Sequence, residues 1–153
     1  MHIAVTFVAL LLAACSAGGS PKIAATDGWT REVAPGQTSA AAYVTISNQG
    51  DGADSLIAAE SSVAAKATLH SSSSAGGIAR MRPIEGGLEI PPHATVAFKP
   101  GGNHIMLTGL QQPLKAGQAV DLSLQFEKSG RQAIALRVLP ATSEDSHMHG
   151  MAM

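Results

Sequence analysis

The amino-acid sequence predicts an all-β protein, built as an antiparallel β-sandwich or a small β-barrel. Residues 120–126 alternate apolar Val, Leu and Phe with polar Asp, Ser and Gln, which is the two-residue period of a half-buried strand. Residues 134–138 show a similar alternation after a turn at 127–130. Glycine and proline turns separate many other short apolar stretches, and no stretch has the 3.6-residue period of an amphipathic helix.

Further short strands are expected along the chain, at residues 40–48, 55–59, 63–70, 78–82, 88–90, 95–99 and 103–108. In the first of them Ala42, Val44 and Ile46 share one face, as in a strand that packs on a core. Residues 71–77 are polar and rich in serine and glycine, and are expected to form a flexible link. Pro140 is expected to end the domain.

The composition fits one domain and narrows the class of partner. The chain has 153 residues, of which 45% are hydrophobic but only 3% aromatic, so the core is expected to consist of small and branched aliphatic side chains. The formal net charge is −1, with 14% charged residues and no basic cluster. The sequence therefore predicts no nucleic-acid partner.

Cys15 is the single cysteine, which excludes several kinds of site. One thiol cannot form an intramolecular disulfide, a cysteine-based zinc site or an iron–sulfur cluster. A blue-copper centre needs a thiolate inside the folded domain, and Cys15 precedes that domain. The chain also shows no recognisable nucleophile turn, readable carboxylate pair or phosphate loop, so we expect a protein that is not an enzyme.

The N-terminal segment has the features of a secretion signal. Residues 3–14 are apolar and uncharged, too short to span a bilayer as a stable helix but long enough for the hydrophobic part of a signal peptide. Leu12-Ala-Ala-Cys15 resembles a bacterial lipoprotein signal, in which cleavage precedes the cysteine and the thiol is acylated. We expect a signal peptide at 1–14 and a lipidated Cys15 with a tether at 15–22; a plain signal peptide that contains a cysteine is the alternative.

Two details bear on this signal. The segment before the apolar run is only Met1-His2, without the Lys or Arg that usually stands there. Ser16 follows the cysteine in place of the Asp that signals inner-membrane retention, and by resemblance this favours the outer membrane. The protein is therefore expected in the periplasm, held to a membrane by its lipid.

Two histidines and two methionines in the middle of the chain form a candidate metal site. Ten residues separate His70 from Met81, and His104 and Met106 follow in one short stretch. If residues 103–108 are extended, His104 and Met106 share one face and their apolar neighbours point the other way. Imidazole and thioether are uncharged ligands, and the soft thioethers select copper(I) over hard cations.

Each of these residues alone is a weak indication. A single methionine in a strand is more often a core residue than a ligand, and a single histidine is more often hydrogen-bonded at the surface. His93, beside two prolines, fits the second description and is left out of the candidate site. Trp29 is expected to be a core or lid residue rather than a metal contact.

The spacing of the four candidate ligands resembles that of the PCuAC family of periplasmic copper(I) chaperones. The gap from His70 to Met81 matches the family pattern, and the gap from Met81 to His104 is one residue longer, which we place in the turns at 86–93. Further blocks that resemble the family lie at 81–83, 99–102, 104–107 and 113–117.

This resemblance covers residues 29–138 and implies a cupredoxin-like β-barrel at 23–140, with the metal near its surface. By this resemblance the copper(I) ligands are His70, Met81, His104 and Met106. The resemblance also implies that copper is delivered to the dinuclear copper centre of cytochrome c oxidase, either directly or through a Sco-type thiol protein.

Residues 141–153 are polar and are expected to form a disordered tail. Five of the last seven residues are His or Met, namely His147, Met148, His149, Met151 and Met153. The tail resembles those with which some PCuAC proteins bind a second copper ion, so it is expected to bind metal, with copper(II) a candidate beside copper(I). The alternative is a disordered end with chance His and Met.

Three roles are consistent with these features. A metallochaperone would carry copper(I) to an oxidase, whereas a copper-buffering or resistance lipoprotein would retain it, with the tail as the main sink. The third role, a redox enzyme, is disfavoured because a thioether-rich site strongly favours copper(I) over copper(II). Loss of oxidase copper after gene deletion would identify the chaperone, and copper sensitivity with normal oxidase would identify the buffer.

Overall fold

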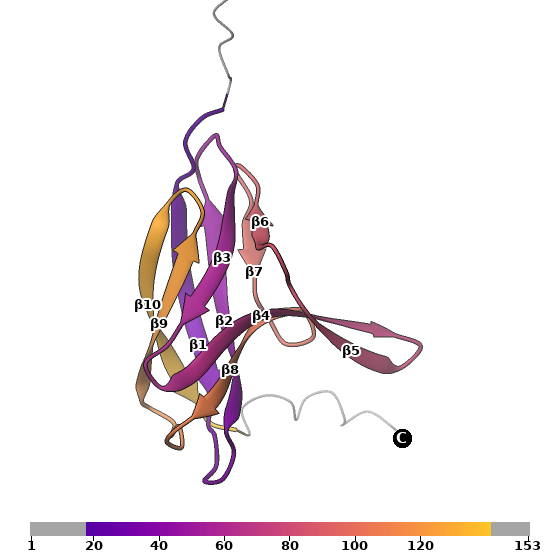
Figure 1. Cartoon of the computed structure of the whole chain (residues 1–153), viewed down its shortest axis with the longest axis vertical. Helices are drawn as coiled ribbons and strands as arrows, with labels where there is room; N and C mark the ends of the chain where they lie inside the picture. The colour runs from indigo at the N-terminus through magenta and orange to yellow at the C-terminus, as the bar shows by residue number, and fades with distance from the viewer. Residues whose placement is uncertain (1–17, 142–153) are drawn as a thin grey trace, which may run out of the picture.

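Ten β-strands run through residues 18–141, the part of the chain that the computed structural model describes (Figure 1). They are β1 (Ile23–Arg31), β2 (Ser39–Asn48), β3 (Asp54–Glu60), β4 (Ala64–Ala75), β5 (Ile78–Pro83), β6 (Leu88–Ile90), β7 (Thr95–Ala97), β8 (Asn103–Leu110), β9 (Ala119–Phe126) and β10 (Gly130–Leu139). Within these residues, no helix is long and apolar enough to cross a membrane. Cys15 and the His/Met residues of the tail lie outside the described residues.

Seven of the strands close into a barrel. Neighbouring strands follow the order β4-β8-β2-β1-β10-β9-β3, and a pairing of Ala59 in β3 with Ala67 in β4 closes the ring. All neighbours in the ring are antiparallel except β1 and β10, which are parallel. Strand direction cannot alternate all the way around a ring with an odd number of strands, so one parallel pair is unavoidable. The predicted barrel is confirmed, with this one difference from a fully antiparallel arrangement.

Small and branched aliphatic side chains fill the barrel interior, as the composition predicts. In β9, the alternating residues Val120, Leu122 and Leu124 are almost fully buried, and the residues between them are more exposed. In β8, Ile105 and Leu107 are completely buried in the same core cluster. Since successive side chains point to opposite faces, the residues that alternate with this pair face away from the barrel interior.

Most of the expected strands are present, but the expected flexible link at 71–77 is wrong. β4 continues to Ala75, and Gly76 and Gly77 then form a two-residue turn into β5, with φ angles of 61° and 79°. Positive φ at both central residues is typical of a type I′ hairpin turn, which glycine adopts without steric cost. The prediction of a loop rested on composition, because runs of serine and glycine are typical of loops. The same composition also suits an exposed polar hairpin.

The first strand was not expected as a strand. The register of β1 with β2 shifts between Thr26 and Trp29, and Asp27 has a φ of 53°, so a bulge interrupts the pattern. Trp29 is half-buried rather than part of the core, and its ring lies against that of Tyr43 with 4.4 Å between centroids.

The β4–β5 hairpin leaves the barrel and projects to one side (Figure 1). β4 pairs with β8 as far as Ser71 opposite Asn103, and its remaining residues pair only with β5. The position where the hairpin separates from the barrel is therefore one residue beyond His70.

Candidate metal centre

Strands β4 and β8 bring the two predicted histidines together. His70 and His104 are direct partners in the antiparallel ladder, and their rings meet edge to face with centroids 5.6 Å apart. Directly paired residues place their side chains on the same face of a sheet. His70 is half-buried, whereas only 4% of His104 is exposed.

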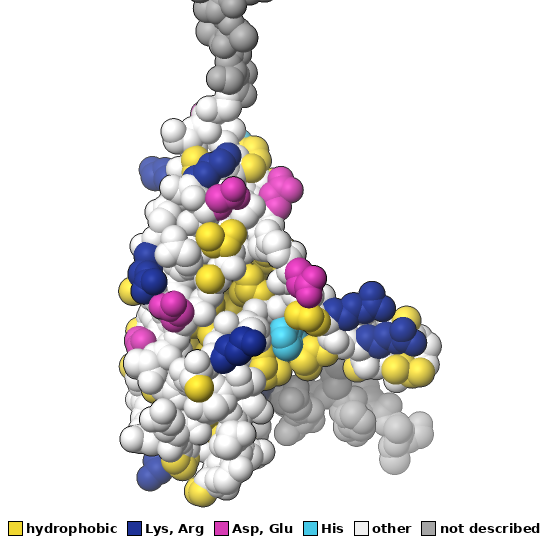
Figure 2. All heavy atoms as spheres, viewed as in Figure 1, with side chains coloured by type: hydrophobic (Ala, Val, Ile, Leu, Met, Phe, Trp, Pro, Cys, Tyr) yellow, Lys and Arg dark blue, Asp and Glu magenta, His cyan; other side chains and the backbone are white. Residues whose placement is uncertain are grey.

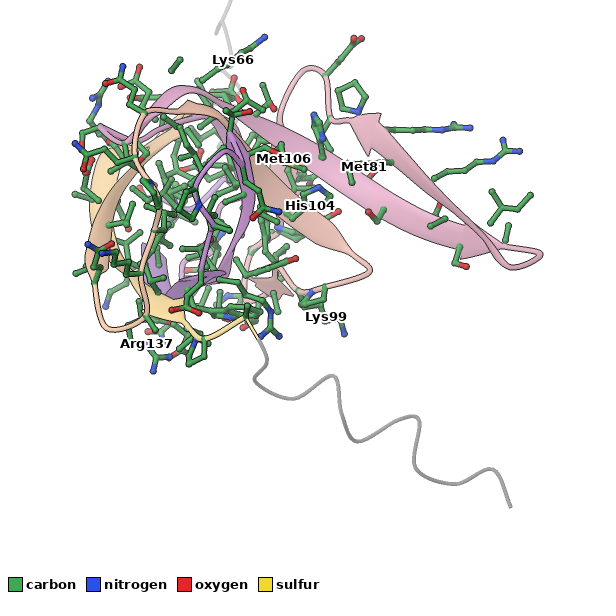
Figure 3. All side chains as sticks on the ribbon, turned by 90° about the horizontal axis from the view of Figure 1, so that it is seen from below. Lys66, Met81, Lys99, His104, Met106 and Arg137 are labelled. Atoms are coloured by element: carbon green, nitrogen blue, oxygen red, sulfur yellow. The ribbon has the colours of Figure 1, made fainter. Side chains whose placement is uncertain are left out.

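The ladders put both methionines on the same face as the histidines. Met106 pairs with Thr68, two residues before the histidine of β4, and Met81 pairs with Ser72, two residues after it. Residues two apart in a strand share a face. Figure 3 shows His104, Met106 and Met81 where the hairpin joins the barrel. Met106 is half-buried, but Met81 is 54% exposed and lies at the solvent side of the group.

Each imidazole keeps one buried nitrogen that has no hydrogen-bond partner among the described residues. These atoms are Nδ1 of His70 and Nε2 of His104. The other nitrogen of each ring lies 3.3 Å from an oxygen, the Thr68 hydroxyl for His70 and the Gly102 carbonyl for His104. A carbonyl only accepts hydrogen bonds, so Nδ1 of His104 carries the proton and its Nε2 presents a lone pair. A buried lone pair without a partner costs free energy, and it is the group that a metal ion would engage.

A tight turn positions His104. The Gly102 N–H donates to the Lys99 carbonyl at 2.9 Å, with Pro100 and Gly101 at the centre of the turn and a φ of 80° at Gly101, as in a type II turn. The Gly102 carbonyl accepts from His104 and also from the Ser72 backbone N–H at 3.0 Å. One carbonyl therefore ties the orientation of His104 to the backbone of β4.

Sequence reasoning missed two positioning groups, the Gly102 carbonyl and the Thr68 hydroxyl. The Pro-Gly-Gly turn directly before His104 is a local signal that could have indicated the first. Thr68 lies two residues before His70. Threonine is common in strands, so the sequence alone does not indicate that its hydroxyl contacts the histidine.

The surroundings favour neutral imidazole at His70. Burial, and next the charge that His104 can carry, lower the pKa of His70 below its ordinary value of 6.5. Only the neutral ring can ligate a metal, so the lowered pKa keeps a ligand available in mildly acidic solution.

The described residues offer soft rather than hard donors at this place. Within residues 18–141, no group of three or more His, Cys, Asp or Glu side chains is placed to hold a metal ion. Two imidazoles and two thioethers on one sheet face are instead the donors that suit copper(I). His93 lies apart from this group: it is exposed and pairs with Asp51 at 2.7 Å, as a surface histidine should.

Comparison with known proteins adds a family and a fold. A family model described as putative lipoprotein LpqE-like matches residues 23–138. A putative lipoprotein of Leifsonia xyli subsp. xyli is 32% identical over 122 residues, which make up 80% of this chain and 72% of that protein.

Solved structures with the same fold include copper proteins. The copper-bound PCuAC domain from PmoF2 matches with a TM-score of 0.66 at 27% identity, over 78% of this chain and 93% of that domain. The copper(I) form of DR1885 from Deinococcus radiodurans matches with a TM-score of 0.60 at 30% identity, over 73% of this chain and 74% of that one. These matches confirm the predicted PCuAC-like barrel.

Proposed function

The chain belongs to the LpqE-like family of putative lipoproteins and shares the fold of PCuAC domains, and on this basis we propose that it is a copper(I)-binding metallochaperone. The expectation that the protein is not an enzyme is confirmed by its relationship to the PCuAC copper chaperone family. The proposed ligands are His70, Met81, His104 and Met106.

One observation carries the assignment of this site. Two facing imidazoles each keep a buried nitrogen without a partner among the described residues, and two thioethers lie on the same face of the sheet. Thioethers are weak ligands for hard ions and bind copper(I) without losing a proton. A neutral ligand set leaves the bound ion with its positive charge, which favours an affinity low enough for the ion to be passed on.

The uneven exposure of the ligands suits transfer. His104 is nearly buried and would hold the ion from the barrel side, whereas Met81 is 54% exposed on the projecting hairpin. An acceptor could replace the exposed thioether first, while the two less exposed imidazoles still hold the copper. We propose that the acceptor is the dinuclear copper centre of cytochrome c oxidase or a Sco-type thiol protein.

The proposed location follows from the family and from the N-terminal signal. Relatives are putative lipoproteins, and Cys15 is the candidate for acylation, so the domain would be anchored to a membrane outside the cytoplasm. We assign it to the periplasm, with the outer membrane favoured by Ser16 after the cysteine.

The tail supports a second metal site and a second candidate role. His147, Met148, His149, Met151 and Met153 are five potential soft or borderline ligands in a short stretch. We propose that they bind a second copper ion, as copper(I) or copper(II). If the tail were the main copper site, the protein would act in copper buffering rather than delivery.

An anaerobic competition titration of the mature chain against a coloured copper(I) chelator tests the proposal. Wild type, Met81→Leu, Ile78→Leu and a variant that ends at Ala141 would be compared. We expect one tightly bound copper in wild type, in Ile78→Leu and in the truncated chain, and a weakened site in Met81→Leu, which keeps apolar bulk but lacks sulfur. Tight binding that disappears only with the tail would identify a copper buffer instead.

A further inference from the structure

The β4–β5 hairpin carries more exposed apolar and cationic side chains than its metal ligand requires. All six residues of β5 are exposed. Of the large hydrophobic side chains that are exposed in residues 18–141, Ile78 and Met81 belong to this strand, at 59% and 54% exposure. The strand also carries Arg80 and Arg82. Figure 2 shows the dark blue of cationic side chains on the projecting hairpin, where the sequence has only arginines, with a hydrophobic patch at its tip.

The arginines and the isoleucine share the face that points away from the copper ligands. Ile78, Arg80 and Arg82 alternate with Ala79 and Met81 along β5. Their partners on β4 are the small residues Ala75, Ser73 and Ser71, which leave this face uncovered by their own strand.

The hairpin is cationic without local compensation. From residue 61 to residue 84 the sequence has Lys66, Arg80 and Arg82 but no Asp or Glu. Among the described residues, neither arginine of β5 forms an ion pair. A chain with a formal net charge of −1 thus concentrates positive charge beside one proposed copper ligand.

The outer edge of β5 is open. β5 ends the strand order and pairs only with β4, so its other edge presents unpaired backbone N–H and C=O groups. An extended peptide can add to such an edge as a new strand, with backbone hydrogen bonds supplying affinity and alternate side chains supplying specificity.

We propose that the edge of β5 is the docking site for the copper-acceptor protein, which adds an acidic extended segment to the sheet beside Met81. This inference rests on the proposed copper function and names the chemistry of the partner. The acidic side chains would face Arg80 and Arg82, and the residues that alternate with them would lie on the face that carries Met81. Docking there places the acceptor's own metal ligands next to the exposed thioether from which transfer would begin.

Two other occupants fit this edge less well. A second copy paired through β5 would bring four arginines together within one pair of strands, which like-charge repulsion disfavours. A membrane with anionic lipids would attract the arginines, but it offers no extended backbone to pair with the open edge. An acidic polypeptide satisfies both features at once.

The test measures binding of a synthetic ten-residue peptide that alternates Glu with Val to the mature, copper-loaded chain. Comparison probes are the same peptide with Lys in place of Glu, the Glu peptide with alternate N-methylated amides, and vesicles of phosphatidylglycerol and phosphatidylcholine. We expect that, of these probes, only the Glu peptide binds. Its binding should shift the amide NMR signals of residues 78–83 and should weaken as salt is added. Failure of the Glu peptide to bind would overturn the proposal, as would equal binding of the Lys or N-methylated peptide.

Variants assign the binding to the hairpin. The double variant Arg80→Gln/Arg82→Gln should weaken peptide binding by about tenfold, whereas Arg137→Gln, on the distant strand β10 (Figure 3), should leave it unchanged. Equal loss of peptide binding in the double variant and in Arg137→Gln would overturn the proposal. Binding of the chain to the vesicles but not to the Glu peptide would also overturn it, as would self-association of the chain that the double variant abolishes. Much tighter peptide binding after removal of residues 142–153 would show that the chain's own tail occupies the edge, and this would overturn the assignment of the edge to an acceptor protein. Copper(I) titration of the double variant should still give one tight ion; its loss would count against the copper site itself rather than the docking site.

Discussion

The imidazoles of His70 and His104 face each other across β4 and β8, with ring centroids 5.6 Å apart and one buried, unpartnered nitrogen on each. A buried polar atom without a partner costs about 1–3 kcal/mol. The metal-free barrel therefore carries a local destabilisation at this pair, which a bound copper ion would remove. Such a trade of stability for function is common at binding sites.

His104→Leu separates the two effects. Leucine fills a similar volume at this buried position but has no polar atom, so it removes the unpartnered Nε2, which is the proposed ligand atom, and the hydrogen bond from Nδ1 to the Gly102 carbonyl. That carbonyl keeps its hydrogen bond from the Ser72 N–H. We expect the metal-free variant to unfold in urea with a free energy equal to that of wild type or about 1 kcal/mol higher, while copper(I) affinity is lost. A metal-free variant less stable by several kcal/mol would show that the ring is chiefly a structural element of the barrel.

Met106→Leu tests the facing of β8. Met106 is half-buried and lies outside the core cluster, whereas its neighbours Ile105 and Leu107 are completely buried within it. The variant should keep its melting temperature and lose copper(I) affinity by about tenfold or more. Ile105→Ala is the contrasting variant, expected to cost about 2–5 kcal/mol of folding free energy. Unchanged copper affinity in Met106→Leu would remove this residue from the ligand set.

The sequence could predict which side chains of β8 point into the core, because this is a local property of the strand. His104 and Met106 alternate with two aliphatic residues, and the period of a strand then decides which pair enters the core. The pairing of His70 with His104 could not be predicted from the residues themselves, because it depends on the register between strands far apart in the chain. The burial of His104 was missed for the same reason, since the metal was expected near the surface of the barrel.

The projecting hairpin marks another limit of the sequence. Residues 71–77 have the composition of a loop, and no apolar alternation indicates a strand. Their strand conformation comes from pairing with β5 across the turn at Gly76 and Gly77, and this pairing depends on a partner strand that the composition of residues 71–77 does not reveal. The sequence predicted that Met81 is a ligand, but not that it stands on an exposed strand edge.

His70 should make the stability of the metal-free protein depend on pH. Burial, then His104, lower the pKa of His70, so below about pH 6.5 the unfolded chain binds more protons than the folded chain. Stability should therefore fall as the pH is lowered below this value and gain nothing from this group above it. Urea unfolding at several pH values would show the fall in wild type and in His93→Gln, an exposed control, and a smaller fall in His70→Gln. Parallel curves for all three proteins would contradict the expectation.

Asp54 is expected to be a main polar support of the barrel. It is 2% exposed, and its carboxylate accepts the backbone N–H groups of Ser55 and Lys128 at 2.8 Å and of Ser129 at 2.9 Å. These bonds tie the start of β3 to the turn between β9 and β10. Asp54→Asn would turn an amide group toward at least one of these donors and should cost about 2–3 kcal/mol of folding free energy at neutral pH.

The pH dependence of this cost identifies the carboxylate as its source. Burial, the largest single influence, raises the pKa of Asp54, but the hydrogen bonds from Ser129, Lys128 and Ser55 together outweigh it and leave the pKa below 3.8. The stabilisation is then complete above pH 3.8 and is lost as the pH falls through the lowered pKa. Urea unfolding should show the difference between wild type and Asp54→Asn shrinking in that acid range, while the exposed control Asp51→Asn stays close to wild type throughout. If wild type and Asp54→Asn differed in unfolding free energy by the same amount at neutral and acid pH, the lost stability would be assigned to packing rather than to the charge of the carboxylate.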